Sequence, residues 1–115
     1  MTDRAYKILT ADQWAALRDA GVFEGAPIDL ADGYIHLSTE AQWRETAAKH
    51  FAGQSDLRLA AVRLESLGDV RWEPSRGGQL FPHLYGPLPL TAVASVEAFD
   101  VADDGEVSTL RAEPS

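Results

Sequence analysis

Residues 34–43 have the sequence Tyr-Ile-His-Leu-Ser-Thr-Glu-Ala-Gln-Trp, and this stretch decides the fold class of the chain. Its first five residues alternate, with Tyr34, His36 and Ser38 on one side and two apolar side chains on the other. Such alternation predicts a strand with one buried face. The next four residues have the Thr-x-x-Gln spacing of a capping box, in which two side chains satisfy the free amides at a helix start. The stretch therefore predicts a strand that leads directly into a helix.

The same arrangement occurs near the N-terminus, where a short strand over residues 6–9 precedes a second capping box at residues 10–13. Trp14 and Leu17 share one face of the helix that follows, and Gly21 is a natural stop. The helix after residue 39 has a matching buried stripe, formed by Trp43, Ala47 and Phe51. The sequence thus predicts two short helices, each preceded by a strand.

The rest of the chain predicts further strands, and the fold class is α+β. Residues 26–33 and 74–78 are rich in Pro, Gly and Asp and are expected to form loops and turns. The predicted strands cover residues 57–64, 70–73, 80–85 and 91–99. A single domain is expected over residues 1–100, followed by an acidic, flexible tail over residues 101–115.

Composition narrows the possible functions. The chain has 115 residues, 45% of them hydrophobic, and its 18 acidic against 10 basic residues give a net charge of −8. An acidic surface disfavours general binding to nucleic acid or to anionic lipid. The absence of cysteine excludes disulfides, thiolate metal sites and cysteine nucleophiles, and it fits a reducing cytoplasm. We expect a cytoplasmic protein, a monomer or a homodimer, without a signal peptide or membrane span.

His36 is the first candidate functional residue. It shares a strand face with Tyr34 and Ser38, and this face leads into the predicted helix start at Thr39. Amides at a helix start bind anions, and a neighbouring imidazole and hydroxyls add donors for phosphate or a ribose diol. The plain alternative is a polar stripe that faces solvent.

The segment Phe81–Pro87 is the second candidate because it places His83 and Tyr85 in a short stretch made rigid by proline. Glu73 would form an acid–base pair with His83 if the two converge. Arg76, beside paired glycines, could reach a phosphate. The alternatives are an edge strand with surface aromatics and a simple hairpin turn. A metal site formed by His36, His83 and Glu73 also stays open, although their spacing matches no local metal motif.

Several of these motifs resemble the uncharacterised family called domain of unknown function 952. The resemblance covers roughly residues 4–99 and rests on Asp-Gly-Tyr-Ile-His-Leu-Ser-Thr at 32–39, Trp-Glu at 72–73, Ser-Arg-Gly-Gly at 75–78 and Phe-Pro-His-Leu-Tyr-Gly at 81–86. It implies a fold related to the ADP-ribosyltransferases and RNA 2′-phosphotransferases, with a mostly antiparallel split sheet and two short helices. By that analogy His36 falls at the second motif position and His83 near the third, whereas Lys7 and Ile8 stand where the first motif has a histidine.

The resemblance and the residues together give one leading hypothesis. The domain would bind NAD or a related ribose-phosphate compound, with NAD as a substrate rather than a resident cofactor, and would transfer or cleave a group. His83, Glu73 and His36 would be catalytic, and the ligand would be bound by Tyr34, His36, Ser38, Thr39, Arg76 and Tyr85. The alternatives are a non-catalytic module that binds a nucleotide or small metabolite, and a metal-dependent hydrolase. A shared pocket further predicts that His36 and His83 lie on facing strands with their rings close together.

Overall fold

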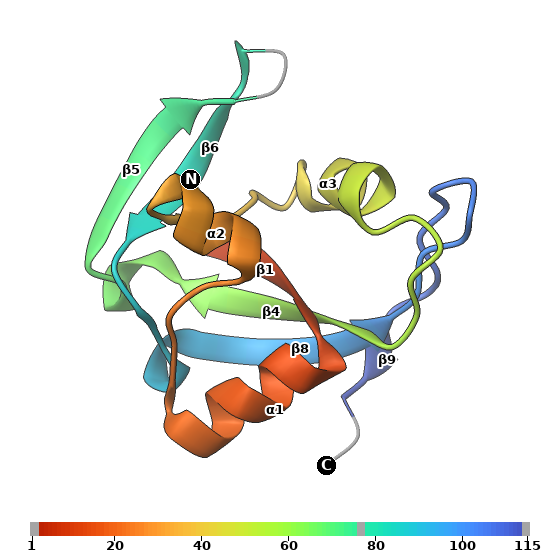
Figure 1. The fold of residues 1–115 in the computed structure, drawn as a ribbon, viewed down its shortest axis with the longest axis horizontal. Helices are drawn as coiled ribbons and strands as arrows, with labels where there is room; N and C mark the ends of the chain where they lie inside the picture. The colour runs from red at the N-terminus through yellow and green to blue at the C-terminus, as the bar shows by residue number, and fades with distance from the viewer. Residues whose placement is uncertain (1–2, 76–77, 114–115) are drawn as a thin grey trace.

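In the computed structural model, which describes residues 3–75 and 78–113, the chain forms mostly antiparallel sheets with few helices (Figure 1). The α+β class predicted from the sequence is confirmed. In chain order the elements are β1 (Arg4–Thr10), α1 (Ala11–Ala20), β2 (Val22–Phe23), α2 (Pro27–Asp32), β3 (Ile35–His36), α3 (Trp43–His50), β4 (Leu57–Arg63), the 3₁₀ turn η1 (Leu64–Ser66), β5 (Asp69–Pro74), β6 (Leu80–Tyr85), β7 (Leu88–Pro89), the 3₁₀ turn η3 (Leu90–Ala92), β8 (Val93–Phe99) and β9 (Arg111–Ala112).

The described strands form three sheets. The largest has the order β1-β4-β8-β9, a second has the order β3-β6-β5, and β2 pairs with β7. Strand β1 runs antiparallel to β4, with Arg4 opposite Arg63 and Thr10 opposite Leu57. Helices α1 and α3 cover opposite faces of the largest sheet, while β5 and β6 form a hairpin that extends away from it (Figure 1).

Successive side chains of the central strands point to opposite faces of the largest sheet, and each face is covered by a hydrophobic core. On β1, Leu9 belongs to the cluster that contains Leu17 of α1, whereas Ile8 belongs to the cluster that contains Trp43 of α3. The ring of Trp43 meets that of Phe99 edge-on, with centroids 5.4 Å apart. The predicted apolar faces of both helices are therefore buried against the sheet.

The first capping box forms as predicted. The amide of Gln13 donates to Thr10 Oγ1 at 3.1 Å, and the amide of Thr10 donates to Gln13 Oε1 at 3.0 Å. Gly21 ends the helix in the left-handed conformation, with φ of 78°. Local sequence was sufficient here because every partner lies within one turn.

The second capping box was predicted to open a helix at Thr39, and this prediction is wrong by one turn. The amide of Thr39 does donate to Gln42 Oε1 at 3.0 Å, but residues 39–42 form a turn and α3 begins at Trp43. The Gln42 side chain also donates to the backbone oxygen of Leu80 at 2.9 Å. This tertiary contact joins the turn to β6. Because α3 begins only at Trp43, its N-terminus does not adjoin Ser38.

Helix α2 lies where a loop was predicted over residues 26–33, so the described chain has three α-helices rather than two. Pro27 stands at its first position, the Asp29 side chain accepts from the amide of Ala26 at 2.7 Å, and Gly33 ends it with φ of 87°. Proline at a helix start and glycine at its stop are helix signals as well as loop signals. The short length of the segment favoured the wrong interpretation.

The segment after Asp100 was expected to be a flexible tail, and the structure gives it contacts with the domain. Val101 is buried and bridges to Val107, and β9 pairs with Glu97 and Ala98 of β8. Glu113 accepts a hydrogen bond from the buried Arg58 at 3.1 Å. Among the helices of the described residues, none has the length and apolar character needed to cross a membrane.

We expect Leu84→Ala to lower the free energy of unfolding by about 2–5 kcal/mol, because Leu84 is fully buried between β6 and the main core. Urea unfolding followed by tryptophan fluorescence measures this loss. The matched control is Leu80→Ala on the same strand, where the side chain is 53% exposed and the loss should stay near 0.5 kcal/mol, roughly the size of a surface substitution. Equal losses in the two variants would contradict the assignment of Leu84 to the core.

Candidate functional site

The three-stranded sheet β3-β6-β5 separates its side chains into an apolar face and a polar face. Ile35 and Leu84, which pair across β3 and β6, are buried in the core. His36 and His83 are the next pair along the same strands, so they share the opposite face, and their ring centroids lie 5.6 Å apart. The prediction that the two histidines lie close together on facing strands is confirmed.

A buried carboxylate that the sequence did not reveal, Asp29 of α2, organises this region. Its side chain is 1% exposed and accepts hydrogen bonds from the backbone amides of Ala26 at 2.7 Å and His36 at 3.1 Å. It also lies 2.6 Å from His36 Nδ1. One carboxylate therefore connects the start of α2 to both the backbone and the ring of a β3 residue.

The charge partner of Asp29 is Lys7 of β1, which is also buried. Lys7 Nζ lies 3.2 and 3.0 Å from the two carboxylate oxygens of Asp29, and 3.1 Å from the backbone oxygen of His36. Burial lowers the pKa of Lys7, and the neighbouring Asp29 partly offsets this effect. Burial alone would raise the pKa of Asp29, but the hydrogen bond from His36 and the charge of Lys7 hold it well below its usual range.

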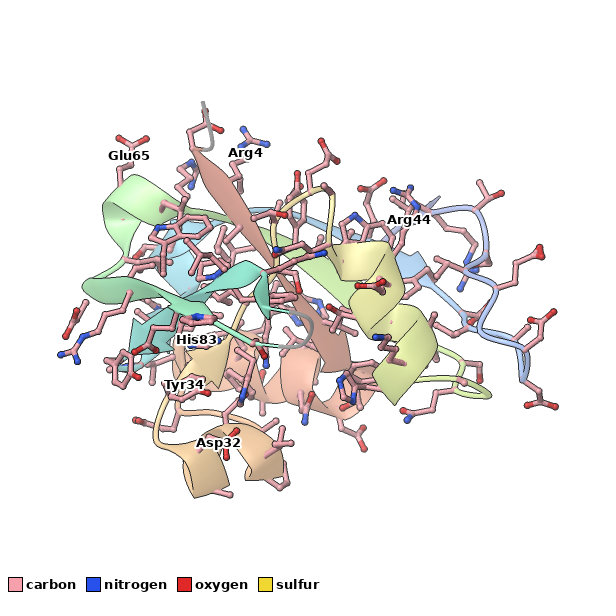
Figure 2. The ribbon with its side chains drawn as sticks, turned by 90° about the horizontal axis from the view of Figure 1, so that it is seen from above. Arg4, Asp32, Tyr34, Arg44, Glu65 and His83 are labelled. Carbon is pink, nitrogen blue, oxygen red and sulfur yellow. The ribbon has the colours of Figure 1, made fainter. Side chains whose placement is uncertain are left out.

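His36 lies between two carboxylates. Nδ1 faces Asp29 at 2.6 Å, and Nε2 faces Asp32 Oδ2 at 2.9 Å. An ionised carboxylate can only accept, so both contacts are hydrogen bonds only when the ring carries a proton on each nitrogen. Asp32 is the outer of the two, with 44% of its side chain exposed, and it lies on the same side of the molecule as Tyr34 and His83 (Figure 2).

A cavity of about 560 Å³ adjoins this network. Its lining includes the polar residues Lys7, Asp29, Asp32, His36, Ser38 and His83, and we call this group the polar end of the cavity. Its apolar walls include Ile8, Ala26, Pro27, Ile28, Phe51 and Phe81. Its volume is in the range of small-molecule sites, and it has their usual pattern of apolar walls with a few convergent polar groups.

His83 forms the predicted pair with Glu73. His83 as a whole is 2% exposed, and its Nδ1 lies 2.8 Å from Glu73 Oε1. The hydroxyl of Tyr85 donates to the same oxygen at 2.7 Å, and the ring of Tyr34 stacks on His83 with centroids 4.1 Å apart. The hydrogen bonds from Tyr85 and His83 lower the pKa of Glu73, and Glu73 in turn raises the pKa of Tyr85.

The structure separates the remaining predicted site residues. Ser38 lines the cavity, where its hydroxyl lies 3.2 Å from Thr46 Oγ1. Four predicted site residues do not occur in the described lining of the cavity: Tyr34, Thr39, Glu73 and Tyr85. Three of them, Tyr34, Glu73 and Tyr85, pack around His83 instead. Arg76, the predicted phosphate ligand, lies outside the described residues.

Sequence reasoning did not find Lys7, Asp29 or Asp32. Lysine within the apolar strand Tyr6–Leu9 was one available signal, because a strand buried on both faces has to pair such a charge. Proline followed two residues later by aspartate was another, since an acidic residue in a first helical turn can accept from the preceding amide. Their convergence depends on the pairing of β1, α2 and β3, which local sequence does not specify.

Metal binding has no support from the arrangement of donors. Across residues 3–75 and 78–113, no group of three or more His, Cys, Asp or Glu side chains is placed to hold a metal ion. The predicted set of His36, His83 and Glu73 is therefore not proposed as a metal centre.

Comparisons with known proteins give a family and solved relatives. A family model described as "Protein of unknown function (DUF952)" matches residues 8–96. The crystal structure of protein CC0527 from Caulobacter crescentus is similar, with 50% identity, a TM-score of 0.85, and 91% of this chain and 93% of that chain covered. The solution NMR structure of CC0527 shares 51% identity, with a TM-score of 0.77 and 89% of each chain covered. Among curated proteins, none matches this chain.

We expect Asp29→Asn to lower the free energy of unfolding at neutral pH by about 3–5 kcal/mol, because it leaves the buried Lys7 without its counter-charge. Folding lowers the pKa of Asp29, so its contribution is complete above the usual value of 3.8 and is lost as the pH falls below it. The variant should therefore lose less stability than the wild type between about pH 4 and pH 2. Urea unfolding across this range measures both effects.

The matched control is Asp69→Asn, which removes the half-exposed ion pair with Arg71 on β5. This change should cost much less stability than Asp29→Asn, because water and salt screen an exposed ion pair. The double variant Lys7→Met/Asp29→Asn should cost less than the sum of its single changes, because it removes both buried charges together. Additive losses would show that Lys7 and Asp29 do not stabilise each other.

Proposed function

This chain belongs to the DUF952 family of proteins of unknown function, and from its own geometry we propose that it binds a ribose-containing small molecule of the NAD class. The ligand occupies the cavity beside His36, and the domain transfers or cleaves a group on it. The observation that carries the proposal is His36 itself, an imidazole at the polar end of a cavity, held on one nitrogen by a buried carboxylate.

The Asp29–His36 pair supports acid–base chemistry. A buried carboxylate on Nδ1 holds an imidazole in one orientation and stabilises its protonated form, which is how such pairs act in hydrolases. With Nδ1 held by Asp29, Nε2 is the nitrogen that can exchange a proton with the reacting groups. In this proposal His36 is the general base, which takes the proton of the water or hydroxyl that attacks the ligand, and Asp29 is its positioning residue.

The cavity walls support a ligand with a flat ring joined to a polar group. Phe51 and Phe81 provide aromatic contact, and Ile8 and Ile28 add aliphatic surface. The hydroxyl of Ser38 lies at the polar end, near His36. A nucleoside has this division between an apolar ring and a hydroxyl-rich sugar.

The resemblance to ADP-ribosyltransferases makes NAD the first compound to test. By that analogy His36 falls at a motif position that contacts the ligand. Lys7 and Ile8 stand in the region where the first motif has a histidine, and the Lys7 amine is engaged by Asp29. His83 stands near the position of a catalytic glutamate. Fold kinship alone does not carry an activity, so the proposal depends on the cavity and its histidine.

A second candidate function is ligand binding without catalysis. His83, which we expected to be the principal acid or base, is 2% exposed and one of its ring nitrogens is engaged by Glu73. Tyr34 covers the ring by stacking. These contacts favour a structural role for His83, and a module that retained only the binding step would need no second catalytic group.

We expect NAD or ADP-ribose to shift amide resonances of residues 35–38 and 81–84 in a ¹⁵N NMR titration, and release of nicotinamide from NAD to report turnover. Nicotinamide leaves C1′ of the ribose as a neutral molecule, and the water or hydroxyl that replaces it must lose a proton. His36→Gln should reduce turnover by about 10²–10⁴-fold, because it removes the group that takes this proton. The matched control is Asp12→Asn, an exposed residue of α1 outside the described lining of the cavity, which should leave turnover close to that of the wild type.

The outcomes separate the two candidates. Binding without nicotinamide release supports the non-catalytic module. Turnover that is equal in His36→Gln and the wild type would exclude His36 as the base. An absence of shifts at millimolar ligand would refute both candidates.

A further inference from the structure

The polar end of the cavity has little capacity to bind an anion. Among the described residues that line it, Lys7 is the one lysine or arginine. An ammonium group has three hydrogens to donate, and Lys7 Nζ already has three acceptors within 3.2 Å, two on Asp29 and one on the His36 backbone. No donor of Lys7 is left for a phosphate.

Two carboxylates make this end of the cavity still less suited to an anion. Asp29 and Asp32 stand three residues apart on α2 and approach His36 from its two nitrogens, at 2.6 and 2.9 Å. A phosphate placed near Nε2 would meet the negative charge of Asp32 at short range. The charge pattern therefore disfavours an anionic group beside His36 Nε2, where the proposed base acts.

The carboxylate of Asp32 is suited to bind hydroxyl groups. A carboxylate has two oxygens with about four acceptor positions, so one contact with His36 leaves acceptor capacity for a ligand. In dinucleotide-binding folds an acidic side chain recognises the ribose hydroxyl in this way. Asp32 is half-exposed at the end of a short helix, where a ligand can reach it.

We propose that Asp32 is a specificity residue, which accepts the vicinal hydroxyls of a ribose beside His36 Nε2 and excludes phosphate from this end of the cavity. This inference rests on the proposed function and makes it narrower. The ligand enters with its sugar hydroxyls toward α2 and β3, and any phosphate it carries points away from His36. An uncharged nucleoside is then sufficient for recognition.

The test compares three probes by ¹⁵N NMR titration: adenosine, 2′,3′-dideoxyadenosine and inorganic phosphate. In the wild type, adenosine should shift residues 35–38, the dideoxy analogue should bind about tenfold more weakly, and phosphate should cause no shift there. Asp32→Asn should weaken adenosine about tenfold and should admit phosphate, because the amide keeps the shape and removes the charge. Asp12→Asn, an exposed carboxylate on α1, is the matched control and should behave as the wild type.

Adenosine that binds Asp32→Asn and the wild type equally would overturn the role of Asp32 and leave the proposed function intact. Equal binding of adenosine and its dideoxy analogue, or phosphate binding at residues 35–38 of the wild type, would do the same. A wild type that binds neither adenosine nor NAD overturns the proposed function itself, and this inference with it. An unchanged amide spectrum of Asp32→Asn outside α2 and β3 verifies that the variant is folded.

Discussion

The buried contact between Asp29 and Lys7 is the interaction on which the site depends. Two opposite charges in an apolar interior persist only when they are paired and fully hydrogen-bonded. Asp29 meets this requirement with donors from β1, β3 and the residue before α2. These contacts connect β1, β3 and α2 through one side chain, and they hold the His36 ring in its orientation.

Much of the fold was accessible from local patterns. Alternation in residues 34–38 and 80–85 identified the two strands that carry the histidines, and their facing arrangement followed from the expectation of a shared pocket. The capping box at Thr10 was correct because all of its contacts lie within one turn. The similar box at Thr39 forms only in part: the Gln42 side chain accepts from the Thr39 amide, but the Gln42 amide donates to the backbone oxygen of Thr39 rather than to its hydroxyl.

The site was harder to predict than the fold. His36 and His83 could be identified because titratable side chains interrupt apolar strands, and the Glu73–His83 pair could be anticipated from the hairpin. Asp29 and Asp32 looked like ordinary loop residues, since aspartate is common in turns. Their importance comes from contact with Lys7 and His36, which are 22 and 7 residues away from Asp29 along the chain. Long-range pairing of this kind has no local periodicity.

Helix α2 is attached to the rest of the domain without a buried apolar face. Asp29 is its buried residue, whereas Ile28 and Leu30 are 60% and 64% exposed. The helix is thus held to the domain mainly by polar contacts rather than by an apolar face, and apolar burial is what normally makes a helix cooperative with the core. It follows that α2 can open while the sheets stay folded only by separating Asp29 from Lys7, so this buried pair sets the free energy of opening. Since this helix forms one wall of the cavity, its opening would also control how quickly molecules enter and leave.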